Sequence, residues 1–495
     1  MVDGIIYSAV NIMKIFKTLP LLLPLGLTLP TQASNQVSLT LDGQLTEPEW
    51  QQAVRYRQFY QMSPETLQQH DDLVDARVLT TDAGLYIGII NHQSVSERKK
   101  QYNLPDGFIQ ADFNRIYVDF SGDGSAGFIF VPALGGGVQD AVLTPKLSSD
   151  YDWDGVWEYQ YAEFDDYWSV EVFIPWHSVS FKPNRDDNGL AKIGVSVQLY
   201  ELATNKIYAS QPQLIDNRNF YSSMPTISAD IPDANMWGFV PYVSAINNQL
   251  NDQLDTETGF NFFYKPKHNQ KLSVAVNPDF GQVDSDNIDV NYSSVETLQT
   301  DKRPFFTEDI GFFDLALEKN TKLIHTRRIG AGADDGSQPI TAIDVAARFM
   351  HQGDNLHIGG FAVQEESLEQ NIGKEFYAGR LKYYADSWQS GLLMTQTQRP
   401  FYDKTARTLA WDSQYQTDKF SLRAALLATD VSGDESTRGQ GVSINSRYEW
   451  NSSVNINGRF LQLSDDFDNL DLRYIQRNDW RYSQIHLNYN QLFDN

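Results

Sequence analysis

The feature that most limits the fold is a strict two-residue alternation in the second half of the chain. After Trp237, segments of about ten residues switch between apolar and polar side chains at each position. Within 442–450 the apolar positions are Val442, Ile444, Tyr448 and Trp450, and the polar ones are Ser443, Asn445, Arg447 and Glu449. A two-residue period belongs to β-strands, whose successive side chains point to opposite faces. The pattern predicts about thirteen long antiparallel strands.

The two faces of these strands differ in chemistry. Charged and amide side chains recur on one face of many successive strands, which indicates a wet interior and a lipid-facing exterior. Ile444 and Tyr448 are expected to face lipid, and Asn445 and Arg447 the interior. The alternative is a large soluble antiparallel sheet with one solvated face. The pattern favours the membrane barrel.

Composition excludes several classes of protein. The chain carries 64 acidic and 39 basic side chains, a formal net charge of −25, which argues against a nucleic-acid partner because phosphate contacts need a basic face. It has no cysteine, which excludes disulfides, zinc–thiolate sites and cysteine nucleophiles. No run of about 18 apolar residues occurs, so a helical integral membrane protein is excluded.

The N-terminus has the pattern of an export signal. Lys14 and Lys17 precede an apolar run over 19–29, and Ala33 ends a segment of small residues suited to cleavage. Residues 1–33 are therefore expected to be a signal peptide, with translation starting at Met13 and the mature chain near Ser34.

The mature chain divides into two β-rich parts. Residues 36–231 contain short strands separated by Gly/Asp turns, which is typical of an antiparallel β-sandwich. A segment rich in acidic residues and proline over 225–235 reads as a linker. Residues 237–495 hold the long alternating strands. The predicted fold class is all-β: a sandwich followed by an incomplete outer-membrane antiparallel barrel.

The alternation lapses over residues 277–314, and such a gap inside a barrel is typical of a functional or plugging segment. Lys302 and Arg303 in this segment, and Arg327 and Arg328 on the strand expected next, are too charged for a lipid face. All four are expected inside the barrel, paired with acids such as Asp284, Asp286 or Glu308.

Motifs in the first part are similar to those of family 9 carbohydrate-binding modules. Asp42-Gly43 followed by 47–50 (EPEW) resembles the opening of that family. Residues 85–88 (LYIG), 116–119 (IYVD) and 168–176 (WSVEVFIPW) fall where the family places later strands.

Motifs in the second part are more specific. Residues 276–284 (VNPDFGQVD), 296–297 (ET), 302–306 (KRPFF) and 327–330 (RRIG) resemble a family of uncharacterised bacterial outer-membrane β-barrels whose members carry such a sugar-module-like domain at the N-terminus. Together the two resemblances cover essentially all of residues 36–495.

The resemblance implies a carbohydrate-binding outer-membrane protein, active in polysaccharide binding, uptake or breakdown. Its partners would be a polysaccharide or oligosaccharide and outer-membrane lipid, with the N-terminal domain periplasmic or surface-exposed. One alternative is a xylanase-like glycoside hydrolase or its accessory module, because family 9 modules accompany such enzymes. A structural envelope protein is the second alternative.

The sequence suggests a carbohydrate site but no catalytic one. Tyr151, Asp152, Trp153 and Asp154 form an acidic aromatic loop, where exposed rings would stack on sugar and carboxylates would accept hydroxyl bonds. No catalytic or metal-binding motif stands out. Calcium is the one cofactor considered, through the oxygen ligands Asp119, Asp123 and Asp140.

Overall fold

The computed structural model describes residues 39–489 except 104–107, 123–126, 144–148, 152, 154, 213–219, 221–222, 233–234, 249–252, 279–297, 299–300, 339, 368–371, 386, 418 and 452–453. The predicted signal peptide over 1–33 lies outside the described residues. Among the described residues, no helix is long and apolar enough to cross a membrane.

The first part of the chain forms two antiparallel sheets that share one apolar core. The smaller sheet has the order β1-β4-β5-β11-β10, with strands Val54–Tyr56, Val74–Thr80, Gly84–Asn91, Trp168–Pro175 and Glu158–Glu163. The larger has the order β3-β2-β14-β13-β6-β7-β8-β9, with strands Gln69–His70, Phe59–Ser63, Lys206–Ala209, Ala191–Glu201, Phe113–Asp119, Gly127–Pro132, Val138–Leu143 and Ser149–Asp150. Two further strands, β12 (Asn184–Arg185) and β15 (Thr226–Ala229), pair with β13. This is the expected β-sandwich architecture.

Alternating Val and Ile residues explain why these strands pack face to face. Ile87 on β5 and Val172 on β11 are fully buried against Val118 on β6 and Val195 on β13. β-branched side chains fit a pleated sheet, and each one buried contributes about 1.5–3 kcal/mol relative to exposure.

A buried carboxylate fixes the start of the described chain to the sandwich. Glu171 on β11 accepts the backbone amides of Asp42 and Gly43 at 3.0 and 2.9 Å, and the Trp50 indole N–H at 3.1 Å. Burial raises the pKa of Glu171 to about 7, although these three hydrogen bonds lower it. The Asp-Gly turn and Trp50, recognised in the sequence as a motif, therefore meet at one buried acid.

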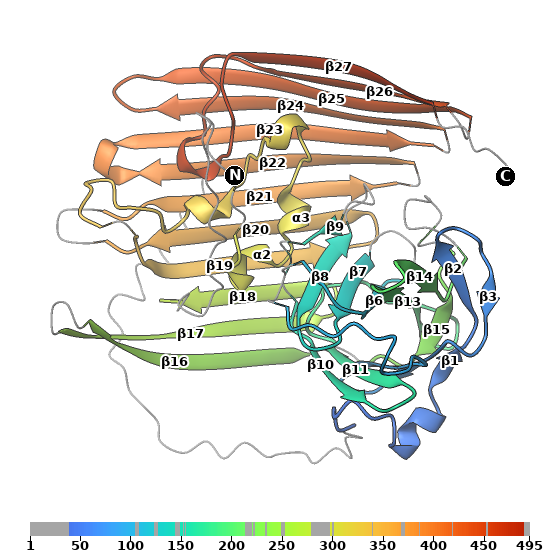
Figure 1. Ribbon diagram of the computed structural model, residues 1–495. Helices are drawn as coiled ribbons and strands as arrows, with labels where there is room; N and C mark the ends of the chain where they lie inside the picture. Colours follow the sequence, from blue (N-terminus) through green and yellow to red (C-terminus); the bar gives the residue numbers. More distant parts are fainter. Residues whose placement is uncertain are drawn as a thin grey trace. The chain divides into compact units, whose positions relative to one another are not determined.

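The second part forms one antiparallel sheet of twelve strands in simple up-and-down order, β16 to β27 (Figure 1). The strands are Met236–Asn248, Gln253–Lys267, Gln270–Val276, Ile343–Gln352, Leu356–Glu365, Glu375–Tyr384, Trp388–Arg399, Lys404–Gln416, Phe420–Ser432, Thr437–Asn451, Val454–Leu463 and Trp480–Tyr489. Among the described residues β16 does not pair with β27, so the sheet is open between them. The predicted all-β fold class with large antiparallel sheets is confirmed.

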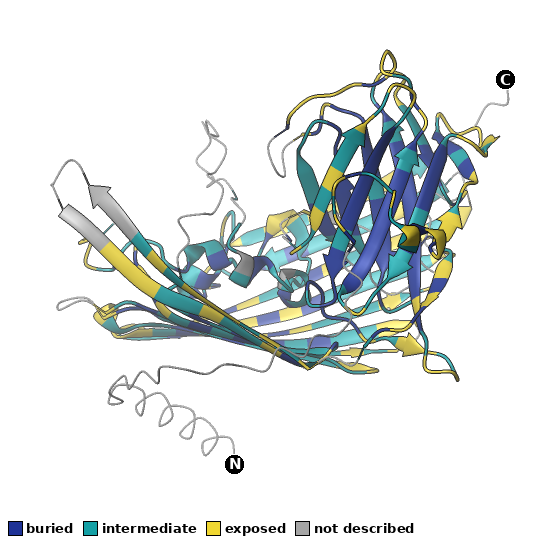
Figure 2. Cartoon of the chain, turned by 90° about the horizontal axis from the view of Figure 1, so that it is seen from below, coloured by how far each residue is buried: buried dark blue, intermediate teal, exposed yellow. Residues whose placement is uncertain are grey.

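One face of this sheet is apolar and exposed. The register places Leu392, Trp411, Leu426 and Val442 side by side across β22 to β25. Trp411 is 41% exposed and Leu426 54%. Figure 2 shows exposed and buried residues alternating along the long strands. Ile444 and Tyr448 lie on this exposed face, as expected.

The opposite face is covered by residues 301–338 and 340–342, named here the covering segment. It contains α2 (Pro304–Thr307), α3 (Ile310–Phe313), η3 (Glu318–Asn320) and η4 (Thr326–Arg328), which Figure 1 shows in yellow across the strands. Phe306, Phe313 and Ile324 of this segment pack with Phe376 and Leu393 of the sheet. Arg327 and Arg328 therefore lie in a 3-10 turn of the covering segment, and their predicted place on a strand is wrong.

Candidate functional site

Two clusters of ion pairs hold the covering segment on the sheet. In the first, Glu308 follows α2 and faces two cations from neighbouring strands, Lys271 on β18 and Arg348 on β19. The Lys271 ammonium lies 2.5 Å from the Glu308 carboxylate, and Arg348 pairs with the same carboxylate. Arg348 also donates to the carbonyls of Phe305 and Glu308 at 2.7 and 2.5 Å. Although burial raises it, these two cations hold the pKa of Glu308 at about 2.

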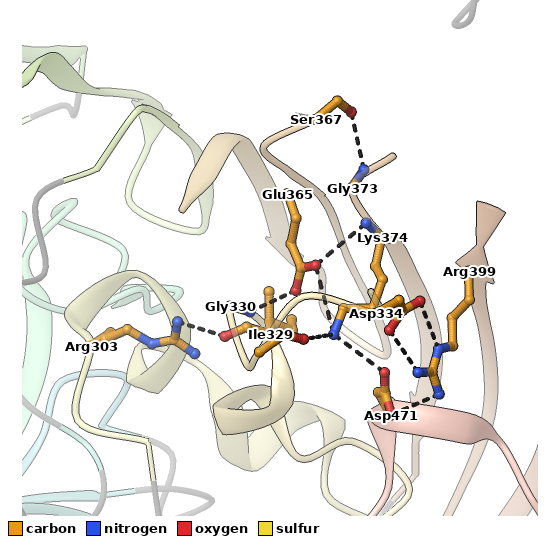
Figure 3. Close-up of polar contacts among 11 residues, drawn as sticks. Arg303, Ile329, Gly330, Asp334, Glu365, Ser367, Gly373, Lys374, Arg399 and Asp471 are labelled. Carbon is orange, nitrogen blue, oxygen red and sulfur yellow. Dashed lines mark hydrogen bonds and ion pairs between the residues drawn. The ribbon is translucent and has the colours of Figure 1, made fainter. Parts of the chain in front are cut away.

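The second cluster lies at the far end of the covering segment (Figure 3). Arg399, at the end of β22, contacts Asp334 of the segment at 2.6 Å and Asp471 at 3.5 Å. Lys374 lies 3.4 Å from Asp471 and 3.8 Å from Glu365, which also accepts the Gly330 amide at 2.8 Å. Four chain regions far apart in sequence thus meet in one charge network.

Arg303 stabilises the covering segment from within. It contacts Asp301 at 2.6 Å and donates to the carbonyls of Ile329 and Thr326 at 2.9 and 2.8 Å. Asp301, two residues before Arg303, is a partner that the sequence analysis did not name, whereas Glu308 pairs with the strand cations Lys271 and Arg348. Asp284 and Asp286, the other expected partners, lie outside the described residues.

Lys302, Arg327 and Arg328 are half-buried. All three belong to the covering segment. The position fits their chemistry, because a charged side chain on a lipid-facing surface would be costly.

The covered face also holds charge on the strands themselves. Arg380 on β21 donates to both carboxylate oxygens of Asp412 on β23, at 2.8 and 2.9 Å, and its guanidinium lies 5.8 Å from the Phe312 ring. Two residues along β21, the Lys382 ammonium lies 5.0 Å from the Tyr384 ring. The covered face of this sheet thus holds ion pairs beside the apolar side chains that pack under the covering segment, whereas its exposed face carries large apolar side chains.

A cavity of about 750 Å³ opens beside this face. Its lining comes from three regions: the sandwich, the covering segment and the sheet. They are represented by Trp153, Ser180, Phe181, Asp309, Phe312 and Lys382. The volume lies within the roughly 300–1,000 Å³ of small-molecule sites.

The sandwich wall of the cavity is fixed to the sheet by backbone contacts. Lys265 on β17 is fully buried and donates to the carbonyls of Trp176 and Val179 at 2.9 and 2.5 Å. The Phe181 amide donates to the His268 carbonyl at 3.2 Å. These contacts bracket the loop that carries Ser180 and Phe181.

The predicted sugar loop is placed differently from expectation. Trp153 is only 3% exposed, with its ring centroid 5.0 Å from Phe128 and 5.9 Å from Phe130. The expectation that it is an exposed ring is wrong, because the indole packs on Phe128 and Phe130 in the sandwich core. Tyr151 is exposed, and Asp152 and Asp154 lie outside the described residues.

The acids considered for calcium have other partners. Asp119 accepts the amides of Ser121 and Gly122 at 3.0 and 2.9 Å, and Asp140 accepts the Trp157 indole N–H at 2.8 Å. Asp123 lies outside the described residues. Across the described part of the chain, no three histidine or acidic side chains gather as metal ligands. Calcium binding stays a prediction.

Sequence reasoning missed the cavity. The alternation of β21, in which Arg380 and Lys382 share the inward face, could have identified that wall. Ser180 and Asp309 carry no comparable signal, because both come from irregular segments that only the tertiary structure brings to the sheet.

Residues 237–350 match a family described as "Domain of unknown function (DUF5916)". No curated protein matches the chain. Similar solved structures include a mutant of the Rh. blastica porin, at 8% identity over 76% of this chain and 96% of that one, with a TM-score of 0.19. Another is Pseudomonas aeruginosa OccK5 (OpdH), at 9% identity over 77% and 97%, with a TM-score of 0.21. These TM-scores are too low to support an argument about the fold, which the strand pairing described above defines.

Proposed function

We propose that the protein resides in the bacterial outer membrane, with the exposed apolar face of its twelve-stranded sheet in contact with lipid. The observation that carries this proposal is the polarity of the sheet. Large apolar side chains cover the face that no part of the described chain shields, while Arg348 and Arg380 lie buried on the other. A sheet in water would show the reverse arrangement.

The energetics of the strands support a lipid environment. Adjacent strands pair along most of their length from β16 to β27, so backbone amides and carbonyls of the inner strands find partners within the sheet. This is a requirement for any β-structure in hydrocarbon. Exposed rings such as Trp388, Trp411, Tyr448 and Trp450 add the aromatic content of a membrane-facing surface.

The covering segment favours a protein that binds a ligand over a channel through which solutes diffuse freely along the covered face of the sheet. Two ion-pair clusters and an apolar core fix it to the strands. A segment held at both ends stays in place on the covered face. The covered face of the sheet is then occupied by the covering segment, and the sandwich contributes further residues to the cavity beside it.

Carbohydrate is the ligand class that we propose for this inner surface and for the sandwich, which would lie in the periplasm or at the cell surface. The proposal is supported by the sequence resemblance of residues 36–231 to sugar modules and by a cavity of ligand size that the sandwich lines. The alternatives are glycoside hydrolysis and a purely structural envelope role.

The membrane proposal can be tested with single cysteines, because the chain has none of its own. Leu426→Cys lies on the exposed face and Leu427→Cys, its neighbour, on the covered face. Each variant is labelled with an environment-sensitive fluorophore in phospholipid vesicles that contain brominated lipid. We expect quenching at position 426 and little at 427. Recovery of the protein in the soluble envelope fraction, or equal quenching at both sites, would contradict a lipid-facing wall.

The carbohydrate proposal is tested by applying the full chain, in detergent, to a glycan array with calcium and with EDTA. Selective binding supports it, and its loss in EDTA would assign calcium a role. Release of reducing sugar from a bound glycan would favour the hydrolase, and absence of any binding would favour the structural alternative.

A further inference from the structure

The cavity beside the covered face has a lining suited to one class of ligand. Six aromatic residues line it: Phe128 of the sandwich, Phe312 of α3 and Tyr384 of β21 are half-buried, whereas Phe120, Trp153 and Phe181 of the sandwich are at most 3% exposed. Rings offer flat apolar surfaces for the C–H faces of a bound molecule. A ligand that uses such a wall has at least one flat apolar face.

The charges of the lining are balanced. Three carboxylates, of Asp119, Asp309 and Asp354, face three cations, of Lys182, Arg185 and Lys382. Lys182 and Asp354 form an ion pair with each other. Because the charges of the described lining residues balance, the lining favours a neutral ligand.

Two polar atoms at the cavity wall lack a partner. The Ser180 hydroxyl and one carboxylate oxygen of Asp309 are both buried and make no hydrogen bond with any described residue. An unsatisfied buried polar atom costs about 1–3 kcal/mol, so such atoms need an explanation. The two come from opposite walls, Ser180 from the sandwich and Asp309 from the covering segment, and both residues line the same cavity.

The carboxyl group of Asp309 can accept or donate a hydrogen bond, because its pKa is raised and the protonated form is favoured. Burial and the adjacent Glu308 carboxylate raise its pKa, while Arg348, Lys271 and Lys265 lower it. A ligand hydroxyl that donates to Asp309 would satisfy the free oxygen, and a second hydroxyl could pair with Ser180. The wall therefore matches a molecule with several hydroxyl groups.

We propose that this cavity is a binding site for a neutral sugar, one to three rings long, held between the sandwich and the covering segment. The sugar's C–H faces contact the aromatic wall, Asp309 exchanges a hydrogen bond with one of its hydroxyls, and Ser180 exchanges one with another. This inference rests on the proposed carbohydrate function and places the site away from the exposed loop around Tyr151.

The test uses the full chain in detergent micelles with xylobiose, cellobiose and maltose as probes, titrated by calorimetry. Asp309→Ala removes the free acceptor, and Ser180→Ala the free hydroxyl. Neither variant loses a hydrogen bond in the unliganded protein. Ser180→Ala should fold with an unchanged Tm, whereas Asp309→Ala should lower it, because Asp309 has a φ of 61° that alanine adopts less readily. Ser178→Ala is the matched control, because Ser178 lies two residues away, bonds to the Val156 carbonyl and does not line the cavity.

We expect a probe to bind, with affinity about tenfold weaker in Asp309→Ala and about threefold weaker in Ser180→Ala. Ser178→Ala should bind as the unmodified protein does, even if its Tm falls. If a sugar binds but the Asp309 and Ser180 variants match the control, the cavity assignment is overturned while the carbohydrate function stands. If no sugar binds on the array or in calorimetry, both fail, and the lipid-facing role is judged by the cysteine experiment alone.

Discussion

The sandwich and the twelve-stranded sheet differ in where they place the large apolar side chains of their alternating strands. In the sandwich, β-branched and aromatic side chains meet between two sheets, and most charges lie outside. In the twelve-stranded sheet, many large apolar side chains point outward, while charged residues such as Arg348 and Arg380 are buried under the covering segment. Both parts consist of antiparallel strands that alternate by two.

The difference shows that alternation fixes the two faces of a strand but not which of them is buried. In the sandwich the apolar face is buried because water is the solvent. In the twelve-stranded sheet an apolar face is left uncovered by the described chain, and the other face packs on the covering segment through ion pairs and apolar side chains. Substitutions that place charge on an apolar face, or remove charge from a covered one, therefore test this comparison directly.

The largest loss of stability is expected when the buried ion-pair cluster under the covering segment loses its carboxylate. Glu308→Ala leaves both Lys271 and Arg348 without their shared carboxylate. Breaking a buried ion pair costs about 3–5 kcal/mol, and the loss should be near the upper end because two cations are affected. The free energy of unfolding in detergent, measured by denaturant titration, provides the check. A loss below about 1 kcal/mol would show that the covering segment is not fixed by this cluster.

A slightly smaller effect is expected in the sandwich core. Trp153→Ala should lower the free energy of unfolding by about 3–5 kcal/mol, near the lower end because loop residues can close over the lost volume. Exposed Tyr151→Ala is the control and should change stability by less than about 0.5 kcal/mol. If Trp153→Ala leaves the melting temperature unchanged, the indole does not close the core.

The exposed face of the twelve-stranded sheet should reject charge. Ile444→Arg places a cation on the apolar face and should cost about 2–4 kcal/mol near mid-membrane. Asn445→Arg, one residue on, points to the covered face, where Asn445 donates to Glu318 at 2.6 Å; a cation there has an acid nearby. Refolding into vesicles measures both variants, and equal tolerance would count against a membrane wall.

The stability of the sandwich should depend on pH through the titration of Glu171. Its pKa rises from an ordinary 4.5 to about 7 on folding, because burial disfavours the charged form. Between these values the folded protein holds a proton that the unfolded chain has released, so stability falls as pH rises through the window. Above pH 7 both states are ionised and the loss, roughly 1–3 kcal/mol, is complete.

Glu171→Gln should remove this dependence, since an amide does not titrate and retains an acceptor for the Asp42 and Gly43 amides. The melting temperature of the variant relative to the unmodified protein, measured from pH 4.5 to pH 8, gives the comparison. Parallel curves would show that Glu171 titrates as an ordinary surface acid.

The smallest effect is expected for an exposed ion pair of the same sheet. Arg438 and Asp430 lie 2.9 Å apart on β25 and β24, but the Arg438 side chain is 87% exposed. Arg438→Ala should change stability by less than about 1 kcal/mol, because water competes for both charges. A loss of stability as large as that of Glu308→Ala would mean that buried and exposed ion pairs contribute equally to the stability of this protein.

The sequence by itself determined the strands, the two-part order and the polarity of each strand face. These follow from a period of two residues and from Asp/Gly turns, which are local properties of the backbone. It also predicted that the charges around Arg303 lie away from lipid. What it could not determine is the partner of each charge, because Glu308 meets Lys271 and Arg348 only after residues distant in sequence come together.

The tertiary structure alone decided the burial of Trp153 and the existence of the cavity. Whether a loop indole faces solvent depends on how the loop folds back over Phe128 and Phe130, and no periodicity encodes that. The cavity, likewise, is the space left among the sandwich, the covering segment and β21. Its wall joins Ser180 and Asp309, which are far apart along the chain, so long-range packing rather than local pattern created the candidate site.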